Sequence, residues 1–313
     1  MQGLVLPTDY DWYTFLTARQ PLDEVNFWQP SGKTTFHTTE PGTPVFFKLK
    51  APHNAIGGFG FFARASVLPA WLAWDSFGDT NGATSFDEMK RRIEKYRSTE
   101  RRDPAGRYEI GCLMIASPVF FAERDCVRQP SEWKPNIVQG SRMDLSAGEG
   151  ARILRECIER ADHAEHALVR EEIAAETIER ERFGTPRPVA PRLGQGTFRV
   201  AVTDAYGRAC AITKEHSLPA LEAAHIRPYA QQGMHAVSNG LLLRSDIHRL
   251  FDKGYVTVTP DLRFDVSDRL RDDFSNGRSY YPLRGNLITR PEGARDRPDA
   301  DALRWHNENV FLR

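Results

Sequence analysis

The sequence contains few cysteines and no long apolar segment. Its 313 residues include only four cysteines, far apart along the chain, at Cys112, Cys126, Cys157 and Cys210. That spacing predicts free thiols in a reducing compartment rather than a disulfide scaffold. No run of about eighteen apolar residues exists, which excludes a conventional membrane-spanning helix. The first residues also lack the basic and apolar regions of a signal peptide, so we expect a cytoplasmic protein.

The sequence also lacks an excess of charge of either sign. Its 42 basic and 42 acidic side chains cancel to a formal net charge of zero, which disfavours indiscriminate binding to nucleic acid. The distribution is uneven, because residues 185–313 carry 19 basic and 15 acidic side chains, and 17 of those basic side chains are arginines. Arginine suits bidentate contact with phosphate. Any affinity for nucleic acid is therefore expected to come from local patches and to depend on salt.

Composition divides the chain into three regions and predicts an α+β fold. Short apolar runs and turn signals dominate residues 1–145. Residues 146–196 begin with apolar residues at helical spacing and end in the sequence GTPRPVAPRLGQG, whose prolines and glycines predict a hinge. The remaining region is residues 197–313. We interpret the long helix as a connector; the alternative is a dimerising coiled coil, which keeps a homodimer open.

The first region is predicted to contain strands and two helices. Each strand is an apolar run bounded by turn residues, and the runs are Pro44–Leu49, Ile56–Ala63 and Ile110–Phe121. The helices are expected over Leu68–Phe77 and Ser85–Tyr96. Ser85 and Glu88 have the spacing of a capping box, which marks the start of the second helix.

Three polar side chains in the last region have the spacing of a one-metal phosphodiesterase site. His225 ends a short apolar run, Asn239 precedes a second one, and His248 lies in the helical segment that follows. The predicted order is strand, loop, strand and helix, which brings two imidazoles and an amide to one cleft. Asp252 follows His248 by one helical turn, so the two side chains share a helix face.

Each of these residue types suits a step of phosphodiester hydrolysis. A histidine with a pKa of about 6.5 can remove a proton from the attacking water at neutral pH. A divalent cation supplies positive charge to the phosphate and to the leaving oxygen. A histidine and a carboxylate can hold that cation while other positions stay open for water and phosphate. An asparagine does not titrate, but its amide can fix a loop by hydrogen bonds.

Each residue also has a purely structural interpretation. A lone histidine is more often an ordinary surface or core residue than a ligand. Asp246 suits the N-cap of the helix that contains His248, and Asp252 could pair with Arg249 on a solvated helix face. The joint spacing of the three motif residues favours the nuclease interpretation over these alternatives.

The motif resembles the HNH endonucleases, whose fold is the ββα-metal motif. The sequences that carry the resemblance are LEAAHIRPYA and SNGLLLRSDIHRLFDKGY, with GQGTFRVAVTDAYGRACAIT before them and LRWHNENVF after them. The resemblance covers residues 192–313. It implies that His225 is the general base and that Asn239 orients it. His248 and Asp252 would then bind one divalent metal ion, Mg²⁺ or Mn²⁺, with Zn²⁺, Co²⁺ or Ni²⁺ as alternatives.

Two departures from the family pattern affect the expected metal site. Many members place a ligand immediately before the base, where this chain has Ala224, so water or Glu222 is expected to fill that position. Many members also bind a structural zinc ion with two C-x-x-C pairs, which the scattered cysteines of this chain cannot provide. The missing ligand leaves open an HNH fold that binds nucleic acid without cutting it.

The first region resembles the PUA-like domains, which include the EVE and YTH domains. The sequence that carries the resemblance is FWQPSGKTTFHTTEPGTPVFFKLKAPHNAIGGFGFFA, within residues 20–145. The resemblance implies a small β-barrel with helices that holds a flipped, modified base in an aromatic pocket. Trp28 and Trp74 are candidates for stacking on such a base, and the amides of Gln29 and Asn54 could bind its edge. The alternative is that these rings belong to the core.

A base-binding domain joined to a nuclease domain resembles the modification-dependent restriction enzymes. The predicted function is therefore a metal-dependent endonuclease that cuts double-stranded DNA containing modified bases, in defence against phage or foreign DNA. Two alternatives stay open. One is an HNH nuclease without a requirement for modification, and the other is a non-cleaving nucleic-acid-binding protein with a degenerate HNH fold.

Overall fold

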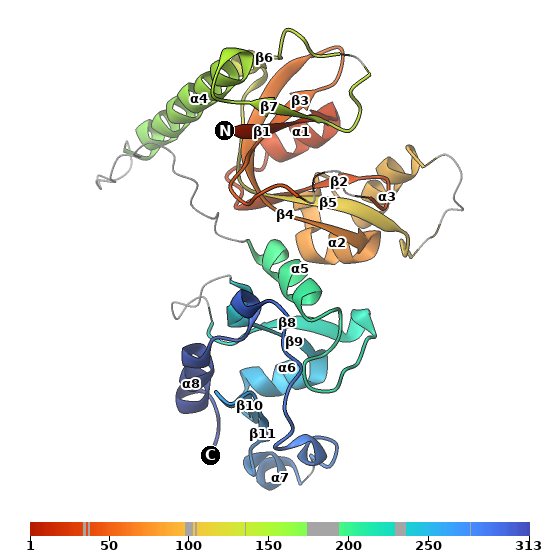
Figure 1. Ribbon diagram of the computed structural model, residues 1–313, viewed down its shortest axis with the longest axis vertical. Helices are drawn as coiled ribbons and strands as arrows, with labels where there is room; N and C mark the ends of the chain where they lie inside the picture. Colours follow the sequence, from red (N-terminus) through yellow and green to blue (C-terminus); the bar gives the residue numbers. More distant parts are fainter. Residues whose placement is uncertain are drawn as a thin grey trace. The chain divides into compact units, whose positions relative to one another are not determined.

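The computed structural model divides into two compact units (Figure 1). It describes residues 1–33, 36, 38–97, 103, 105–134, 136–173, 194–228, 236–275 and 277–313, with the side chains of 163–173 excepted. The first unit is Met1–Gly194 and the second is Gln195–Arg313. Within this described part of the chain, no helix is both long enough and apolar enough to cross a bilayer.

A seven-stranded sheet forms the centre of the first unit. Its path is β2-β5-β4-β3-β1-β7, and β6 pairs with β4 beside that path. The strands are β1 (Gln2–Thr8), β2 (Glu24–Gln29), β3 (Pro44–Leu49), β4 (Ala55–Pro69), β5 (Glu109–Phe120), β6 (Val127–Arg128) and β7 (Ser141–Asp144). Neighbours are antiparallel except β1 and β3, which run parallel. The three predicted strands are confirmed as β3, β4 and β5, although β4 extends further than expected.

The predicted small β-barrel is wrong. Among the described strands the sheet is open, with β2 at one end of the path and β7 at the other. Leu4 and Leu6 of β1 are buried with Trp12 of helix α1 (Tyr10–Thr17). Val5, on the opposite face of β1, is buried with Ile153 of helix α4 (Gly148–Ile173). A barrel has a single interior face, whereas this sheet buries side chains on two faces, so helices on both sides take the place of closure.

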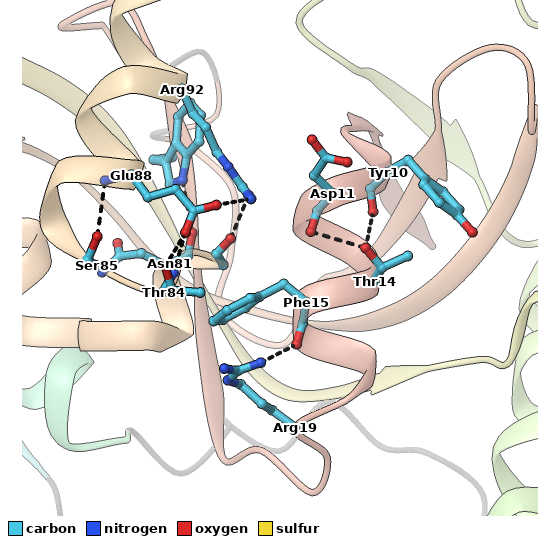
Figure 2. Close-up of polar contacts among 12 residues, drawn as sticks. Tyr10, Asp11, Thr14, Phe15, Arg19, Asn81, Thr84, Ser85, Glu88 and Arg92 are labelled. Atoms are coloured by element: carbon cyan, nitrogen blue, oxygen red, sulfur yellow. Dashed lines mark hydrogen bonds and ion pairs between the residues drawn. The ribbon is translucent and has the colours of Figure 1, made fainter.

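Two helices follow β4 in the first unit. They are α2 (Ala70–Phe77) and α3 (Phe86–Glu94), joined through the short 3-10 helix η1 (Gly78–Asn81). The predicted N-cap of α3 is confirmed, because Oγ of Ser85 accepts the backbone N–H of Glu88 at 3.3 Å. The Glu88 carboxylate returns to the N–H of Thr84 at 2.8 Å and also contacts Arg92 (Figure 2). The start of α3 is therefore fixed by side chains on both sides of the cap.

The long helix predicted as a connector packs on the sheet of the first unit. Ile153 and Cys157 of α4 are fully buried in the same cluster as β1, β3 and β4 residues. Arg152 of α4 contacts Glu149 and Glu156 and donates to the carbonyl of Arg128 in β6. Residues 174–193 lie outside the described residues, so most of the predicted hinge at 184–196 does as well.

The strands and the helix predicted for the motif are confirmed in the second unit. Its elements are α5 (Gln195–Ala205), β8 (Leu221–His225), β9 (Gly240–Arg244), α6 (Ser245–Asp252), β10 (Val256–Val258), β11 (Phe264–Val266), α7 (Arg269–Phe274) and α8 (Ala300–Asn309). β8 pairs antiparallel with β9, and β10 with β11. Leu241 and Leu243 of β9 are buried with Ile247 and Phe251 of α6. This shared core fixes α6 against the β8–β9 hairpin.

Candidate active site

Strands β8 and β9 and helices α5 and α6 position the motif residues. In the hairpin register, Ala224 lies opposite Leu241 and His225 opposite Gly240. A Cβ atom on Gly240 would lie 2.4 Å from Cγ2 of Val202 in α5. Glycine is therefore needed at this position, because it lets α5 approach the end of the hairpin closely.

His225 is the last residue of β8 and is half-buried. Its imidazole stacks on the ring of Phe198 in α5, with centroids 3.9 Å apart and planes inclined by 11°. Stacking fixes the plane of the imidazole and leaves its nitrogens at the edge of the pair. Phe198 could not be predicted from the sequence, because no spacing rule links a residue in α5 to the motif.

Asn239 fixes the chain immediately after His225. It ends the short 3-10 helix η5 (Val237–Asn239) and is only 6% exposed. Its Oδ1 accepts the N–H of Arg227 at 2.9 Å, and its Nδ2 donates to the carbonyl of Arg227, also at 2.9 Å. Its own carbonyl accepts the N–H of Ile226 at 2.9 Å. Loss of this side chain would leave the partly buried N–H and carbonyl of Arg227 without these hydrogen-bond partners.

His248 lies between two carboxylates. Its Nδ1 is 2.7 Å from Oε2 of Glu222 on β8, and its Nε2 is 3.4 Å from Oδ2 of Asp252, one turn along α6. Side chains alternate along a strand, so Glu222 and Ala224 share one face of β8 and His225 belongs to the other. The structure thus gathers Glu222, His248 and Asp252, and it places His225 three residues further along the same strand.

The two carboxylates approach different edges of the His248 ring. A metal ion bound at one ring nitrogen would be out of reach of the carboxylate at the other nitrogen. Glu222 and Asp252 therefore do not converge on one metal position. Across the described residues, no three His, Cys, Asp or Glu side chains are gathered as a metal-binding cluster. Burial raises the pKa of the Asp252 carboxyl, while His248 opposes that effect and Glu222 adds to it. Ala224, where many family members have a ligand, is fully buried.

Asp246 does not serve as the N-cap of α6, which was its structural interpretation. The N-cap position belongs to Arg244. The guanidinium of Arg244 donates two hydrogen bonds to the Asp246 carboxylate, at 2.6 and 2.7 Å, and the hydroxyl of Tyr280 donates a third at 3.0 Å. These contacts, that of Arg244 first, lower the pKa of Asp246 to about 2. Asp246 is therefore a structural anchor at the start of the helix.

Trp28 and Trp74 of the first unit lie near one buried asparagine. The indole N–H of Trp28 donates to the carbonyl of Asn81 at 3.0 Å. The Asn81 side chain in turn donates to the carbonyl of Ala73 at 3.1 Å, the residue before Trp74 in α2. The ring of Trp74 lies 6.3 Å from that of Phe86. Both indoles are half-buried, so each combines packing with a partly exposed surface.

Gln29 and Asn54 are not gathered with these two indoles. Gln29 follows Trp28 in β2, but strand alternation turns its side chain to the other face of the strand. Asn54 immediately precedes β4, which is 15 residues long. Trp28 pairs with Cys112 of β5, and Cys112 pairs with Ser66 in the other half of β4. Of the four predicted base-binding residues, only the two tryptophans therefore share one region.

Comparisons with known proteins bear on the second unit. Residues 210–259 match a family model described as HNH endonuclease. Among solved structures, the "Modification dependent TagI restriction endonuclease" aligns at 12% identity over 93% of this chain and 78% of that chain, with a TM-score of 0.30. A likeness at that TM-score establishes no shared fold. No curated protein matches the sequence. The family match and the β8–β9–α6 arrangement together show that the second unit of this chain contains an HNH endonuclease domain.

Proposed function

We propose that this chain is a metal-dependent endonuclease that hydrolyses phosphodiester bonds of DNA. The observation that carries the proposal is the position of His248 on α6, held between Asp252 of the same helix and Glu222 of β8, the hairpin strand that ends at His225. An imidazole oriented by one carboxylate and facing a second is a donor set that suits a divalent cation. An imidazole three residues further along the same strand suits proton transfer.

His248 and Asp252 are the residues that would hold the metal ion. The Nδ1 edge of His248 is occupied by Glu222 at 2.7 Å, so Nε2, on the side of Asp252, is the nitrogen available to a metal. Two protein ligands leave several positions for water and phosphate oxygens, which suits Mg²⁺ or Mn²⁺. When bound, the ion supplies positive charge to the phosphate and the leaving oxygen.

His225 takes the role of general base in this proposal. An imidazole titrates near neutral pH and can accept the proton of an attacking water. The ring is fixed by stacking on Phe198 at 3.9 Å. The chain that follows it is fixed by the two hydrogen bonds between Asn239 and Arg227. Asn239 therefore positions the base through the backbone and does not itself transfer a proton.

Cleavage of supercoiled plasmid tests the nuclease proposal. Wild-type protein should convert plasmid to the nicked or linear form with Mg²⁺ or Mn²⁺ and should fail to do so in EDTA. A matched control is the His225→Ala variant, which lacks the proposed base. A wild type that binds DNA but never cuts it, with any of five ions, Mg²⁺, Mn²⁺, Zn²⁺, Co²⁺ or Ni²⁺, would instead support the non-cleaving alternative suggested by Ala224.

We further propose that the first unit selects DNA with modified bases, as a restriction enzyme for defence against phage or foreign DNA requires. Support comes from the half-buried indoles of Trp28 and Trp74 around Asn81. An aromatic face contributes about 1–3 kcal/mol per stacked base. A flipped base costs a few kcal/mol to unstack, so it needs such a surface. A cell's own genome would be spared if it lacks the modification.

The test of selectivity uses one DNA sequence with and without modified cytosine or adenine. Preferential cleavage of one modified form supports the proposal. Equal cleavage of all forms supports the alternative of an HNH nuclease with no requirement for modification. A single HNH site cuts one strand, so a monomer should nick DNA and a dimer should cut both strands. Measuring cleavage at several protein concentrations separates these two cases.

A further inference from the structure

The backbone of Arg227 is held on both sides by one side chain. Asn239 accepts the N–H of Arg227 and donates to its carbonyl, each at 2.9 Å. Arg227 is the second residue after His225, the last residue of β8. The side-chain amide of Asn239, which fixes the chain near the proposed base, therefore also fixes the backbone from which the Arg227 side chain extends.

The guanidinium of Arg227 faces an aromatic ring of helix α8. Its central carbon lies 5.3 Å from the centroid of the Trp305 ring, within the range of a cation–π contact. Trp305 is half-buried and belongs to the sequence LRWHNENVF. An arginine that rests on an aromatic face keeps its N–H donors at the edge of the guanidinium plane, where they can bind a planar or tetrahedral anion.

Arg227 belongs to the arginines of the second unit that have no acidic partner among the described residues. Several of the others contact a carboxylate: the pairs are Arg208–Asp204, Arg244–Asp246, Arg269–Asp273, Arg284–Asp265 and Arg304–Asp301. Among the described residues, Arg227 contacts no carboxylate, and its buried Nε atom has no hydrogen-bond acceptor. Residues 229–235, which follow in the chain, contain no Asp or Glu. The guanidinium is therefore not paired with a carboxylate among the described residues and has at least one donor without an acceptor.

We infer that Arg227 binds a backbone phosphate of the DNA strand that is cut, with Trp305 holding the guanidinium in place. This inference rests on the proposed nuclease function and adds a residue that contacts the substrate. The Nε atom is buried, so the terminal N–H groups of the guanidinium would make the contact, and a phosphate offers oxygens with the spacing of the guanidinium fork. The anchored backbone and the Trp305 ring leave little freedom to lose when the phosphate binds.

The experiment compares the full chain carrying Arg227→Ala or Arg227→Lys with a parent that cannot cut. Both substitutions are made in the His225→Ala background, and affinity for a DNA duplex is measured in EDTA at several salt concentrations. Arg227→Ala should weaken binding about tenfold or more. It should also reduce the slope of log affinity against log salt by about 0.9, the value of one phosphate contact. Arg227→Lys should restore the slope, because it keeps the charge, but not the full affinity.

Arg304→Ala is the matched control, because Arg304 is adjacent to Trp305 and pairs with Asp301. It should leave both the affinity and the slope unchanged. Thermal unfolding of each variant confirms that the fold is retained. In the cutting-competent background, Arg227→Ala should also slow single-turnover cleavage, with Arg227→Lys giving partial rescue.

The possible results separate this inference from the function on which it rests. If wild type cuts DNA but Arg227→Ala leaves the salt slope unchanged, the phosphate contact is refuted and the nuclease proposal stands. If Arg304→Ala reduces the slope as much as Arg227→Ala does, the effect is one of general charge and the inference is equally refuted. A wild type that neither binds nor cuts DNA refutes both.

Discussion

Glu222 on strand β8 lies 2.7 Å from His248 on helix α6, through its Oε2 atom and the Nδ1 atom of the imidazole. A proton on Nδ1 satisfies this contact, because an ionised carboxylate can only accept. The lone pair of the neutral ring is then on Nε2, which is the nitrogen nearer to Asp252. In a neutral ring, Glu222 thereby favours the Nδ1–H tautomer of His248 and leaves the Nε2 edge to bind a cation.

Replacement of Glu222 by Gln should weaken divalent-metal binding about 10–100-fold, the usual cost of removing a carboxylate that supports a metal-bound histidine. The measurement is titration of the full chain with Mn²⁺ by calorimetry. Nitrogen chemical shifts of His248 should report a loss of the Nδ1–H tautomer. If Glu222 had a purely structural role, the tautomer would stay unchanged. The control is Glu215→Gln, because Glu215 accepts a backbone hydrogen bond from Ser217 instead. Unchanged Mn²⁺ affinity in Glu222→Gln would contradict the assignment.

Replacement of His225 by Ala should slow cleavage about 10²–10⁴-fold, which is the usual contribution of a general base. Affinity for DNA should stay nearly the same, because phosphate contacts are not removed. Single-turnover cleavage and equilibrium binding measure the two effects separately. His216→Ala, at an exposed histidine of the same unit, should leave both unchanged. Cleavage by His225→Ala within tenfold of the wild-type rate would remove this residue from the mechanism.

His306 should make the stability of the chain depend on pH. The residue is 2% exposed, and burial lowers its pKa from 6.5 to about 4, against the opposing hydrogen bond to the carbonyl of Phe251. The unfolded state therefore binds a proton that the folded state excludes. Stability is complete above the unfolded pKa and falls as pH decreases from about 6.5 to about 4, by about 3 kcal/mol in total.

Chemical denaturation of wild type and His306→Gln between pH 8 and pH 4 measures this dependence. The variant should be less stable at pH 8, because it loses the stacking on Phe251, and its stability should change less as pH falls. His216→Gln provides the control for an exposed histidine. Parallel curves for wild type and His306→Gln would show that another group is responsible for the pH dependence.

Replacement of Trp28 by Ala should remove the preference for modified DNA and leave metal binding intact. The reason is that Trp28 offers a half-buried aromatic face beside α2, whereas the arginines of the nuclease domain suit phosphates, which position DNA without specifying its sequence. Binding of matched modified and plain duplexes to the full chain, in the His225→Ala background, measures the preference. Trp28→Phe should keep part of it through stacking.

The control for Trp28 is Trp133→Ala, because Trp133 packs on the face of the sheet that α4 covers. Its loss should alter stability without altering the choice of DNA. The contrary result is that the protein that keeps Trp28 binds modified and plain duplexes with equal affinity, for the cytosine and the adenine modifications alike. That result would refute the base-binding proposal.

The local order of the motif could be predicted from the sequence, because polar residues at the ends of apolar runs mark strand ends. The spacing of His248 and Asp252 likewise predicts their shared helix face, and the structure places them 3.4 Å apart. The barrel prediction failed although the sequence contained a signal against it. Every residue of PVFFKL in β3 is buried, and a run without alternation is typical of a strand covered on both faces.

Contacts between distant segments could not be predicted. Neither the stacking of Phe198 on His225 nor the contact of Trp305 with Arg227 follows a sequence spacing. The sequence LRWHNENVF was recognised as part of the family resemblance, but nothing in it indicates which residues it meets. Such contacts depend on the packing of α5 and α8 on the hairpin, which the whole core of the second unit decides.

Helix α8 supports the motif from two directions. Trp305 faces Arg227, and the next residue, His306, stacks on Phe251 of α6 at 3.7 Å and contacts Thr257 of β10. During synthesis, a ribosome completes the motif from His225 to Asp252 before it reaches this helix. A chain released before residue 300 would therefore carry every motif residue without its support. An mRNA with a stop codon between the codons for residues 252 and 300 should therefore give a protein that contains the motif but does not cut DNA.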